Sequence, residues 1–116
     1  MEESILKTIR KMIGPSVSYD VFDTDLIVHI NSAFFVLYQL GVGPAEPFKI
    51  TGESETWDDF MNGARDLEAV ISYVYMKVRM AFDPPTTGYL VSSYESAIKE
   101  LEWRLNVMVD PGPWPQ

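Results

Sequence analysis

The stretch of residues 65–85, RDLEAVISYVYMKVRMAFDPP, is the part of the sequence that most constrains the fold. Placed on a helix, it is apolar on nearly every side, and its polar positions form one narrow stripe: Glu68, Ser72, Arg79 and Asp83. A helix that is apolar almost all round is buried, with other elements packed against several of its sides. It is too short and too charged to cross a bilayer, which needs about 20 mostly apolar residues. Because Pro84 and Pro85 cannot continue a helix, the sequence predicts a buried central helix over residues 65–83.

Three other segments show the apolar spacing of amphipathic helices, namely residues 4–13, 23–40 and 90–106. Asp23 is expected to cap the second of them, and Gly41 to end it in the left-handed conformation. In the last segment the predicted core face is Leu90, Tyr94, Ala97, Ile98, Leu101 and Leu105.

Between the second and the central helix, residues 44–56 are expected to form an irregular loop, because prolines, glycines and glutamates leave little to bury. Within it, Phe48 and Ile50 are expected to pin a short extended piece, and Thr56 to cap a helical turn over residues 57–61. The predicted fold is all-α, a small bundle of about four to five helices around the central one. With 116 residues the chain is long enough for one core, so residues 1–109 are expected to form a single helical domain. Residues 110–116, with three prolines, are expected to be an irregular Pro-rich tail.

Composition excludes several classes of function. The chain has 9 Lys and Arg against 17 Asp and Glu, a net charge of −8, which is unfavourable for tight binding of nucleic acid. No helix carries a basic exposed face, so a DNA-binding helix-turn-helix is a distant third candidate. The absence of cysteine excludes disulfides, thiolate metal sites and cysteine catalysis. Residues 1–12 do not resemble a secretory signal, and no membrane association is expected.

No constellation for catalysis, cofactor binding or metal binding is recognised. His29 is the only histidine, and the nearest carboxylate, Asp25, is well explained by its favourable position near a helix N-terminus. Glycine-rich phosphate loops, nucleophile elbows and zinc-binding HExxH motifs are missing. We therefore expect no enzyme activity, no cofactor and no metal.

The tryptophans point instead to an interaction protein. Trp57 is expected in a short turn, Trp103 off the core face of the last helix, and Trp114 in the Pro-rich tail. Tryptophan is enriched at protein interfaces because its burial on assembly gives a large contact area. The alternative is that Trp57 and Trp103 cover the edge of the monomer's own core. The predicted interface comprises these three tryptophans and three residues of the loop: Phe48, Glu53 and Glu55.

Four stretches of the sequence, taken together, resemble the head–tail connector (adaptor) proteins of long-tailed bacteriophages and prophages. They are FDTDLIVHINSAFFVLYQLGVGP, WDDF, YVYMKVRMAFDPP and IKELEWRLNVMVDP, and they span most of the chain. The resemblance implies a small helical bundle without catalytic residues. It also implies a ring of copies between the portal of the DNA-filled head and the tail.

On this interpretation the partners are other copies of the chain, the portal protein and tail-proximal connector proteins. The location is the head–tail junction of the virion, and the host cytoplasm during assembly. DNA would pass through the ring without sequence-specific binding, since an acidic wall repels phosphate. The rival hypothesis is a small acidic regulator that binds a single protein partner, which would explain the charge and the tryptophans without self-association.

Overall fold

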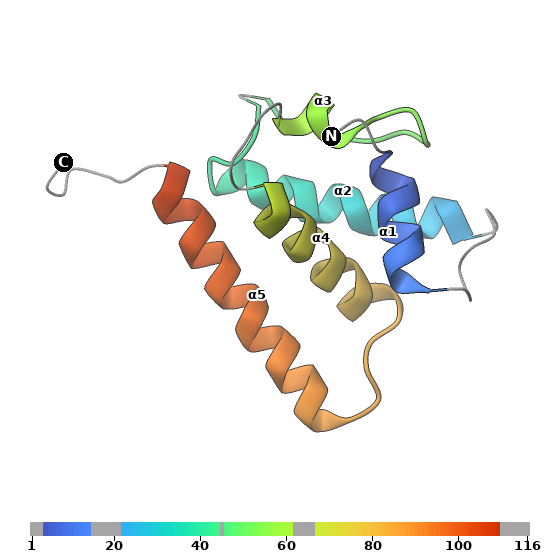
Figure 1. Cartoon of the computed structure of the whole chain (residues 1–116), viewed down its shortest axis with the longest axis vertical. Helices are drawn as coiled ribbons and strands as arrows, with labels where there is room; N and C mark the ends of the chain where they lie inside the picture. The colour runs from blue at the N-terminus through green and yellow to red at the C-terminus, as the bar shows by residue number, and fades with distance from the viewer. Residues whose placement is uncertain (1–3, 15–21, 45, 62–66, 110–116) are drawn as a thin grey trace, which may run out of the picture.

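The computed structural model describes residues 4–14, 22–44, 46–61 and 67–109. Five α-helices follow one another in this part of the chain: α1 (Ile5–Ile13), α2 (Asp23–Gln39), α3 (Trp57–Met61), α4 (Leu67–Phe82) and α5 (Gly88–Val109) (Figure 1). These described ranges contain no β-strand, and their one isolated β-bridge joins Ser4 to Thr56. The prediction of a small all-α bundle is confirmed. The predicted tail at residues 110–116 lies outside the described residues.

Helix α4 is the centre of the bundle. Its residues Val70, Tyr73, Val74 and Val78 are fully buried, and the helix packs against α1, α2 and α5. The predicted contacts of the central helix with the second and the last helix are therefore confirmed. After Phe82 the chain leaves the helix at the two prolines, as expected.

Helix α2 packs its predicted face against α4, and the five buried residues of that face are Leu26, Ile30, Ala33, Phe34 and Leu37. The helix ends as predicted at Gly41, which has a φ of +85°. The N–H of Gly41 donates to the carbonyl of Tyr38, and that of Val42 donates to the carbonyl of Leu37. This is the Schellman motif. A residue in the left-handed conformation turns the chain back, so that two carbonyls of the last turn, which have no partner within the helix, accept hydrogen bonds. The buried side chains of Val42 and Leu37 provide the apolar contact that accompanies it.

The predicted role of Asp23 as an N-cap is wrong. The cap position is Phe22, which makes no side-chain cap hydrogen bond, and Asp23 is the first helical residue of α2. The carboxylate of Asp23 instead accepts two hydrogen bonds from Nη2 of Arg10 on α1, at 2.9 and 2.8 Å. A charge-assisted contact to a guanidinium is stronger than a neutral cap bond, so the carboxylate joins two helices.

The loop before α3 is irregular, as predicted, and is held onto the bundle at Ile50. This side chain is 2% exposed, and the Asn31 side chain on α2 hydrogen-bonds both backbone polar groups of Ile50. At the start of α3, Thr56 caps the helix through its hydroxyl, which accepts from the N–H of Asp59. The carboxylate of Asp59 accepts from the N–H of Thr56 in return, which completes a reciprocal capping box.

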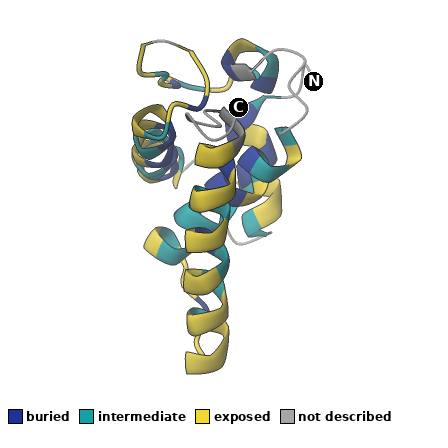
Figure 2. Cartoon of the chain, turned by 90° about the vertical axis from the view of Figure 1, so that its left-hand side faces the viewer, coloured by how far each residue is buried: buried dark blue, intermediate teal, exposed yellow. Residues whose placement is uncertain are grey.

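Helix α5 is longer than predicted and less buried. It begins at Gly88 rather than Leu90, because the hydroxyl of Thr87 accepts the N–H of Leu90 and so caps the first turn. Among its residues 88–107, whose burial is described, only Ile98 and Leu105 are buried. Leu90, predicted in the core face, is 43% exposed, so that prediction is wrong. Figure 2 looks onto the exposed side of α5, which packs chiefly on α4.

None of the helices in the described ranges is both long enough and apolar enough to span a lipid bilayer.

Candidate interaction surfaces

Trp57, predicted at an interface, lies in the core of the monomer. It is fully buried beside Phe34, with 6.3 Å between the ring centroids. Its indole Nε1–H donates to the hydroxyl of Thr8 on α1 at 3.1 Å, and that hydroxyl donates to the carbonyl of Ser4 at 2.7 Å. A buried tryptophan needs such a partner for its one polar group. The structure thus shows the alternative role for Trp57, that of a core residue which fixes α3 to α1.

Phe48 also makes its contacts within the monomer. It is half-buried and packs edge-to-face on Phe34 and Phe60, with ring centroids 5.2 and 5.3 Å away. Gly43 passes close under the Phe60 ring, and a Cβ at this position would lie 2.5 Å from it. With a φ of +95° as well, residue 43 has to be glycine for the loop to close over this aromatic cluster.

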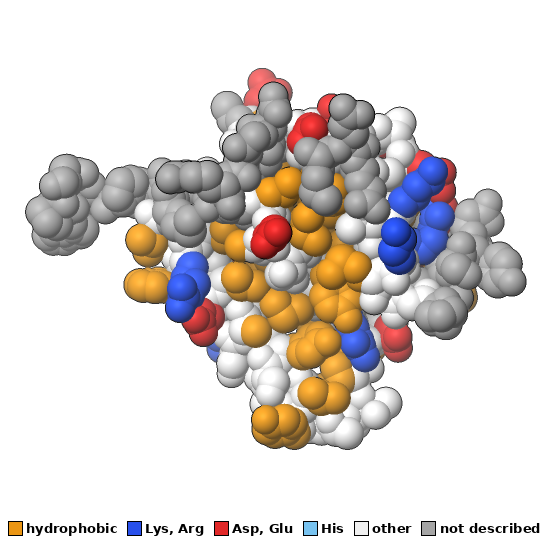
Figure 3. Space-filling view, viewed as in Figure 1, with side chains coloured by type: hydrophobic (Ala, Val, Ile, Leu, Met, Phe, Trp, Pro, Cys, Tyr) orange, Lys and Arg blue, Asp and Glu red, His pale blue; other side chains and the backbone are white. Residues whose placement is uncertain are grey.

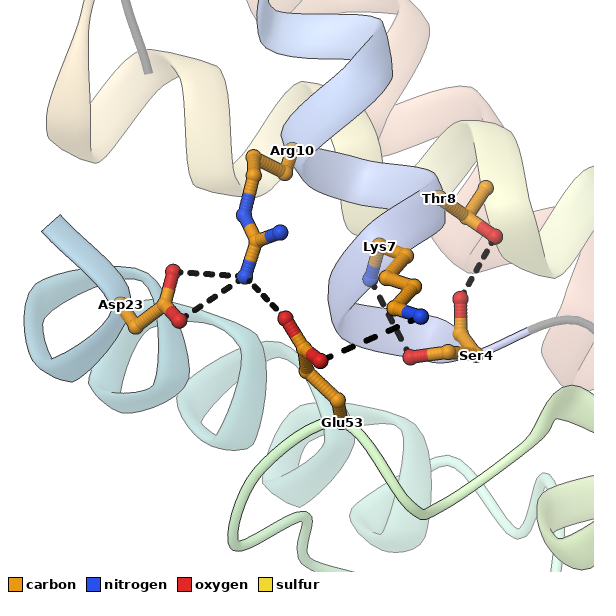
Figure 4. A network of polar contacts seen from close by, with 6 residues as sticks. All are labelled: Ser4, Lys7, Thr8, Arg10, Asp23 and Glu53. Carbon is orange, nitrogen blue, oxygen red and sulfur yellow. Dashed lines mark hydrogen bonds and ion pairs between the residues drawn. The ribbon is translucent and has the colours of Figure 1, made fainter. Parts of the chain in front are cut away.

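Glu53 takes part in an ion-pair network that ties the loop to α1 and α2 (Figure 4). Its carboxylate accepts a 2.8 Å hydrogen bond from Arg10 Nη2, the same nitrogen that contacts Asp23, and lies 3.9 Å from Lys7 Nζ. The hydrogen bond from Arg10 is the main cause that holds the pKa of Glu53 below its ordinary value. The Arg10 side chain is 13% exposed, so it is shielded from solvent between two helices and the loop.

Glu55 organises the turn that precedes α3. One of its carboxylate oxygens accepts from both the N–H and the hydroxyl of Thr51, at 3.0 and 2.8 Å, and the other accepts from the N–H of Gly52. Burial raises the pKa of this carboxyl, but the hydrogen bonds outweigh burial, and the net pKa lies below its ordinary value. Both loop glutamates therefore have a structural task within the monomer.

Trp103 is a predicted interface residue whose side chain remains exposed to solvent in the structure. Its side chain is 66% exposed on α5, and Val107, one turn further on, is 42% exposed. These two residues belong to a stripe that runs along the helix, which we call the α5 outer face. All six of its residues are exposed: Tyr89, Ser92, Ser96, Glu100, Trp103 and Val107. Trp114 lies outside the described residues.

A second exposed stripe, on α2, is not among the residues predicted from the sequence. We call it the α2 outer face, and its members are Val28, Ser32, Phe35, Tyr38 and Gln39. The rings of Phe35 and Tyr38 lie 6.1 Å apart, so they form one continuous aromatic patch. The sequence does contain a signal for it, since residues 33–37, AFFVL, are five successive apolar positions. A helix cannot turn five successive side chains toward one core, so some of them must face outward.

A third feature is the open groove between α2, α4 and α5, with a volume of about 670 Å³. Its lining mixes apolar with charged side chains: His29, Ser32, Ala33, Lys77, Met80, Ala81, Glu95, Ile98, Lys99 and Glu102. At its edge the buried Tyr73 hydroxyl donates to Glu102 at 2.8 Å, and burial raises the pKa of this tyrosine. His29 is half-buried and lies edge-to-face on Phe82. No group of three potential metal ligands occurs among the described residues.

Apolar side chains also gather over α4 and α5 on the face seen in Figure 3. The half-buried apolar residues of α4 and α5 that pack around the core include Ile71, Tyr75 and Leu101. The described chain thus presents apolar surface on more than one side. Isolated apolar residues are normal on a soluble protein, whereas contiguous patches mark places where other molecules bind.

Comparison with known proteins identifies the family. The sequence matches the phage connector protein family over residues 5–112, a range that includes all five helices described above. Searches of the curated proteins and of the solved structures find no significant match. The family is one of structural proteins at the head–tail junction of the virion, where they interact with other virion proteins. The resemblance noted in the sequence is therefore confirmed, and the chain belongs to the phage connector protein family.

Proposed function

We propose that copies of this connector form a ring between the portal and the tail, and that the DNA passes through this ring without sequence-specific binding. The partners would be the neighbouring copies, the portal protein and tail-proximal connector proteins, with assembly in the host cytoplasm. The observation that supports this proposal most is the presence of two separate exposed apolar stripes, on α2 and on α5. A subunit within a ring meets one neighbour on each side and therefore needs two different contact surfaces.

The charge distribution supports passage rather than capture of DNA. The chain has a net charge of −8, and several of its cations are already paired within the monomer. Arg10 contacts Asp23 and Glu53, and Arg104 contacts Glu100. Tight binding of a duplex requires lysines and arginines that are available to neutralise phosphates. An acidic wall with few such cations repels the phosphate backbone and lets the duplex slide.

Among the predicted interface residues, Trp103 and Trp114 are the ones we assign to contacts with neighbours. Trp57, Phe48, Glu53 and Glu55 would act indirectly, because they fix the loop on which a neighbouring subunit would rest. The tail at residues 110–116 is proposed to reach a neighbour or another virion protein. Its prolines restrict the unbound conformations, which lowers the entropy lost on docking, so Trp114 is suited to act as an anchor.

The experiment uses phage heads that carry the portal but lack the connector. Purified wild-type protein should add a cyclic layer at the portal, visible by electron microscopy, whereas the double variant Trp103→Ala, Trp114→Ala should add it weakly or not at all. Glu68→Ala, at an exposed position of α4 outside the loop and both outer faces, is the matched control and should bind like the wild type. A monomer in free solution is compatible with the proposal, because the portal acts as a template for weak contacts. Capture of one soluble partner at one-to-one stoichiometry, without binding to heads, would instead establish the regulator hypothesis.

A further inference from the structure

We propose that the α5 outer face of one copy packs antiparallel on the α2 outer face of a second copy. This inference rests on the proposed ring and specifies which surfaces form its repeated contact. Between residues 88 and 107, helix α5 buries only two of its side chains in the monomer, Ile98 and Leu105. Its opposite side ends in the exposed Trp103 and Val107, which a second packing partner would cover.

The shapes of the two faces are complementary in one register. On α5, Ser92 and Ser96 form a low section between the bulky Tyr89 and Trp103, and a shallow depression lies along this section. On α2, the bulky Phe35 and Tyr38 follow the smaller Val28 and Ser32. When Val28 is placed opposite Trp103 in an antiparallel pair, equal rise along both helices brings Phe35 opposite Ser96. Large side chains then meet small ones along the whole contact, as ridges-into-grooves packing requires.

The α2 outer face also has a place for the Trp103 indole. A shallow depression of about 600 Å³ lies beside Phe35 and is lined by Val28, Asn31, Ser32, Phe35, Val36 and Lys49. The apolar members suit the indole ring, and the hydroxyl of Ser32 is a suitable acceptor for its Nε1–H. The ammonium of Lys49 at the rim adds a cation for the aromatic face.

Charges of opposite sign meet in the same register. Glu100 and Arg104 pair with each other at 2.8 Å in the monomer, but both side chains are more than half exposed, so each can also reach a neighbouring copy. Glu100 precedes Trp103 by one helical turn, and this position comes opposite Asn31, beside which Lys49 lies in the depression. At the other end, Arg104 approaches the exposed Asp25 on α2. A parallel packing with Val28 on Trp103 would carry Phe35 beyond Val109, the end of α5, so it would lose the contact with the serines. Charge and shape therefore select the same, antiparallel orientation.

The contact joins two different surfaces, so every copy has both halves of it. Such a heterologous contact repeats from copy to copy, and it closes into a ring when the rotation between neighbours divides a full turn. A symmetric dimer would require the same face on both partners, which neither charge arrangement favours.

The test uses the absence of cysteine in the chain, which gives a clean background for cross-linking. Gln39→Cys and Ser92→Cys are made separately, since these exposed polar positions lie opposite each other in the proposed register. The two variants are mixed at high protein concentration, and also on portal-bearing heads, and treated with a short bis-maleimide reagent. The expected product is a cross-linked dimer that contains one chain of each variant, identified by isotope labelling and mass spectrometry. Glu68→Cys, at an exposed position of α4, mixed with Ser92→Cys is the control and should give no such product.

Charge reversal gives an independent test of the register. Lys49→Glu and Glu100→Lys should each weaken association at least several-fold. The two variants mixed together should recover it, because alternating copies then present one wild-type Lys–Glu pair and one pair with the charges exchanged. Unchanged melting temperatures would show that both monomers are intact. Cross-links within each single variant alone, or failure of the mixture to recover, would overturn the inference. If the wild type binds heads but the mixed cysteine variants give no cross-linked product, this contact is wrong while the ring proposal stands. If the wild type binds no heads and the mixed variants give no product, both fail.

Discussion

The side-chain amide of Asn31 on α2 pairs with both backbone polar groups of Ile50. The Ile50 N–H donates to Asn31 Oδ1 at 2.8 Å, and Asn31 Nδ2 donates to the Ile50 carbonyl at 3.1 Å. The Asn31 side chain thus makes the two backbone hydrogen bonds that a neighbouring β-strand would otherwise make to Ile50, whose own side chain is buried. Backbone groups that enter a core need such partners, because an unpaired one costs free energy.

Asn31→Ala should therefore destabilise the monomer by roughly 1–3 kcal/mol, because it removes two partly buried hydrogen bonds and leaves the N–H and carbonyl of Ile50 without a partner. The free energy of unfolding in urea measures the effect. Ser32→Ala, at the next position on the exposed side of α2, is the control and should unfold like the wild type. Equal midpoints for the two variants would show that the Ile50 backbone is satisfied in another way.

Val74→Asp should unfold the domain. Val74 is fully buried at the centre of α4, and a carboxylate there has no partner, which costs several kcal/mol and is comparable to the whole stability of a small domain. Circular dichroism at 25 °C should show loss of the helical signal. Ser72→Asp on the exposed side of the same helix should remain folded. A Val74→Asp variant that melts within a few degrees of the wild type would contradict the central position of α4.

Stability should decrease in acid, partly through Glu53. Its pKa is lower in the folded chain than its ordinary value of 4.5, mainly because of the hydrogen bond from Arg10. A group with a depressed pKa stabilises the fold above its unfolded pKa, and this contribution disappears as the pH falls through the folded pKa. Below about pH 4.5 the wild type should therefore lose stability more steeply than Glu53→Gln. Melting temperatures of both proteins between about pH 6 and pH 3 test this, and parallel curves would contradict it.

The two described tryptophans should behave in opposite ways. Trp57→Phe removes the donor to Thr8 and part of a buried ring, so it should lower the free energy of unfolding by roughly 1–4 kcal/mol. Trp103→Ala should leave the unfolding of the isolated chain nearly unchanged, because its side chain is 66% exposed. Urea unfolding of the two variants side by side makes the comparison. A destabilised Trp103→Ala variant would show that this residue serves the monomer rather than an interface.

The sequence was sufficient for those parts of the fold that depend on local pattern. The buried helix α4, the inward face of α2 and the ending at Gly41 all follow from apolar spacing and from glycine and proline positions. The burial of Trp57 could not be predicted in this way, because its partner Thr8 is 49 positions away in the sequence. A helix of five residues, such as α3, has too few positions for its spacing to reveal which side is buried.

For the candidate surfaces, too, local pattern could be interpreted from the sequence, whereas contacts between distant residues could not. Trp103 was recognisable because it lies off a clear helical stripe. The partners of the two loop glutamates could not be recognised from local pattern, because Arg10 is 43 positions from Glu53 and Glu55 pairs with the turn formed by Thr51 and Gly52. Aspartate is a residue type that often caps helices, so the sequence suggested this role for Asp23. Its actual partner, Arg10, comes from another helix and could not be recognised from local pattern. The α2 outer face was overlooked because Phe35 and Tyr38 lie next to Phe34 and Leu37, which do belong to the core.

The chief packing of α5 on a single helix, α4, has a consequence for the order of events in assembly. Residues 88–107 of α5 contain two buried apolar side chains, against five in α2 and four in α4, so local opening of α5 should require less free energy than opening of either other helix. Amide hydrogens of α5 should exchange with solvent earlier than those of the other long helices, and binding of a neighbour should slow them. Each subunit then gains rigidity as it joins, and a subunit that has already docked offers the next one a more ordered surface.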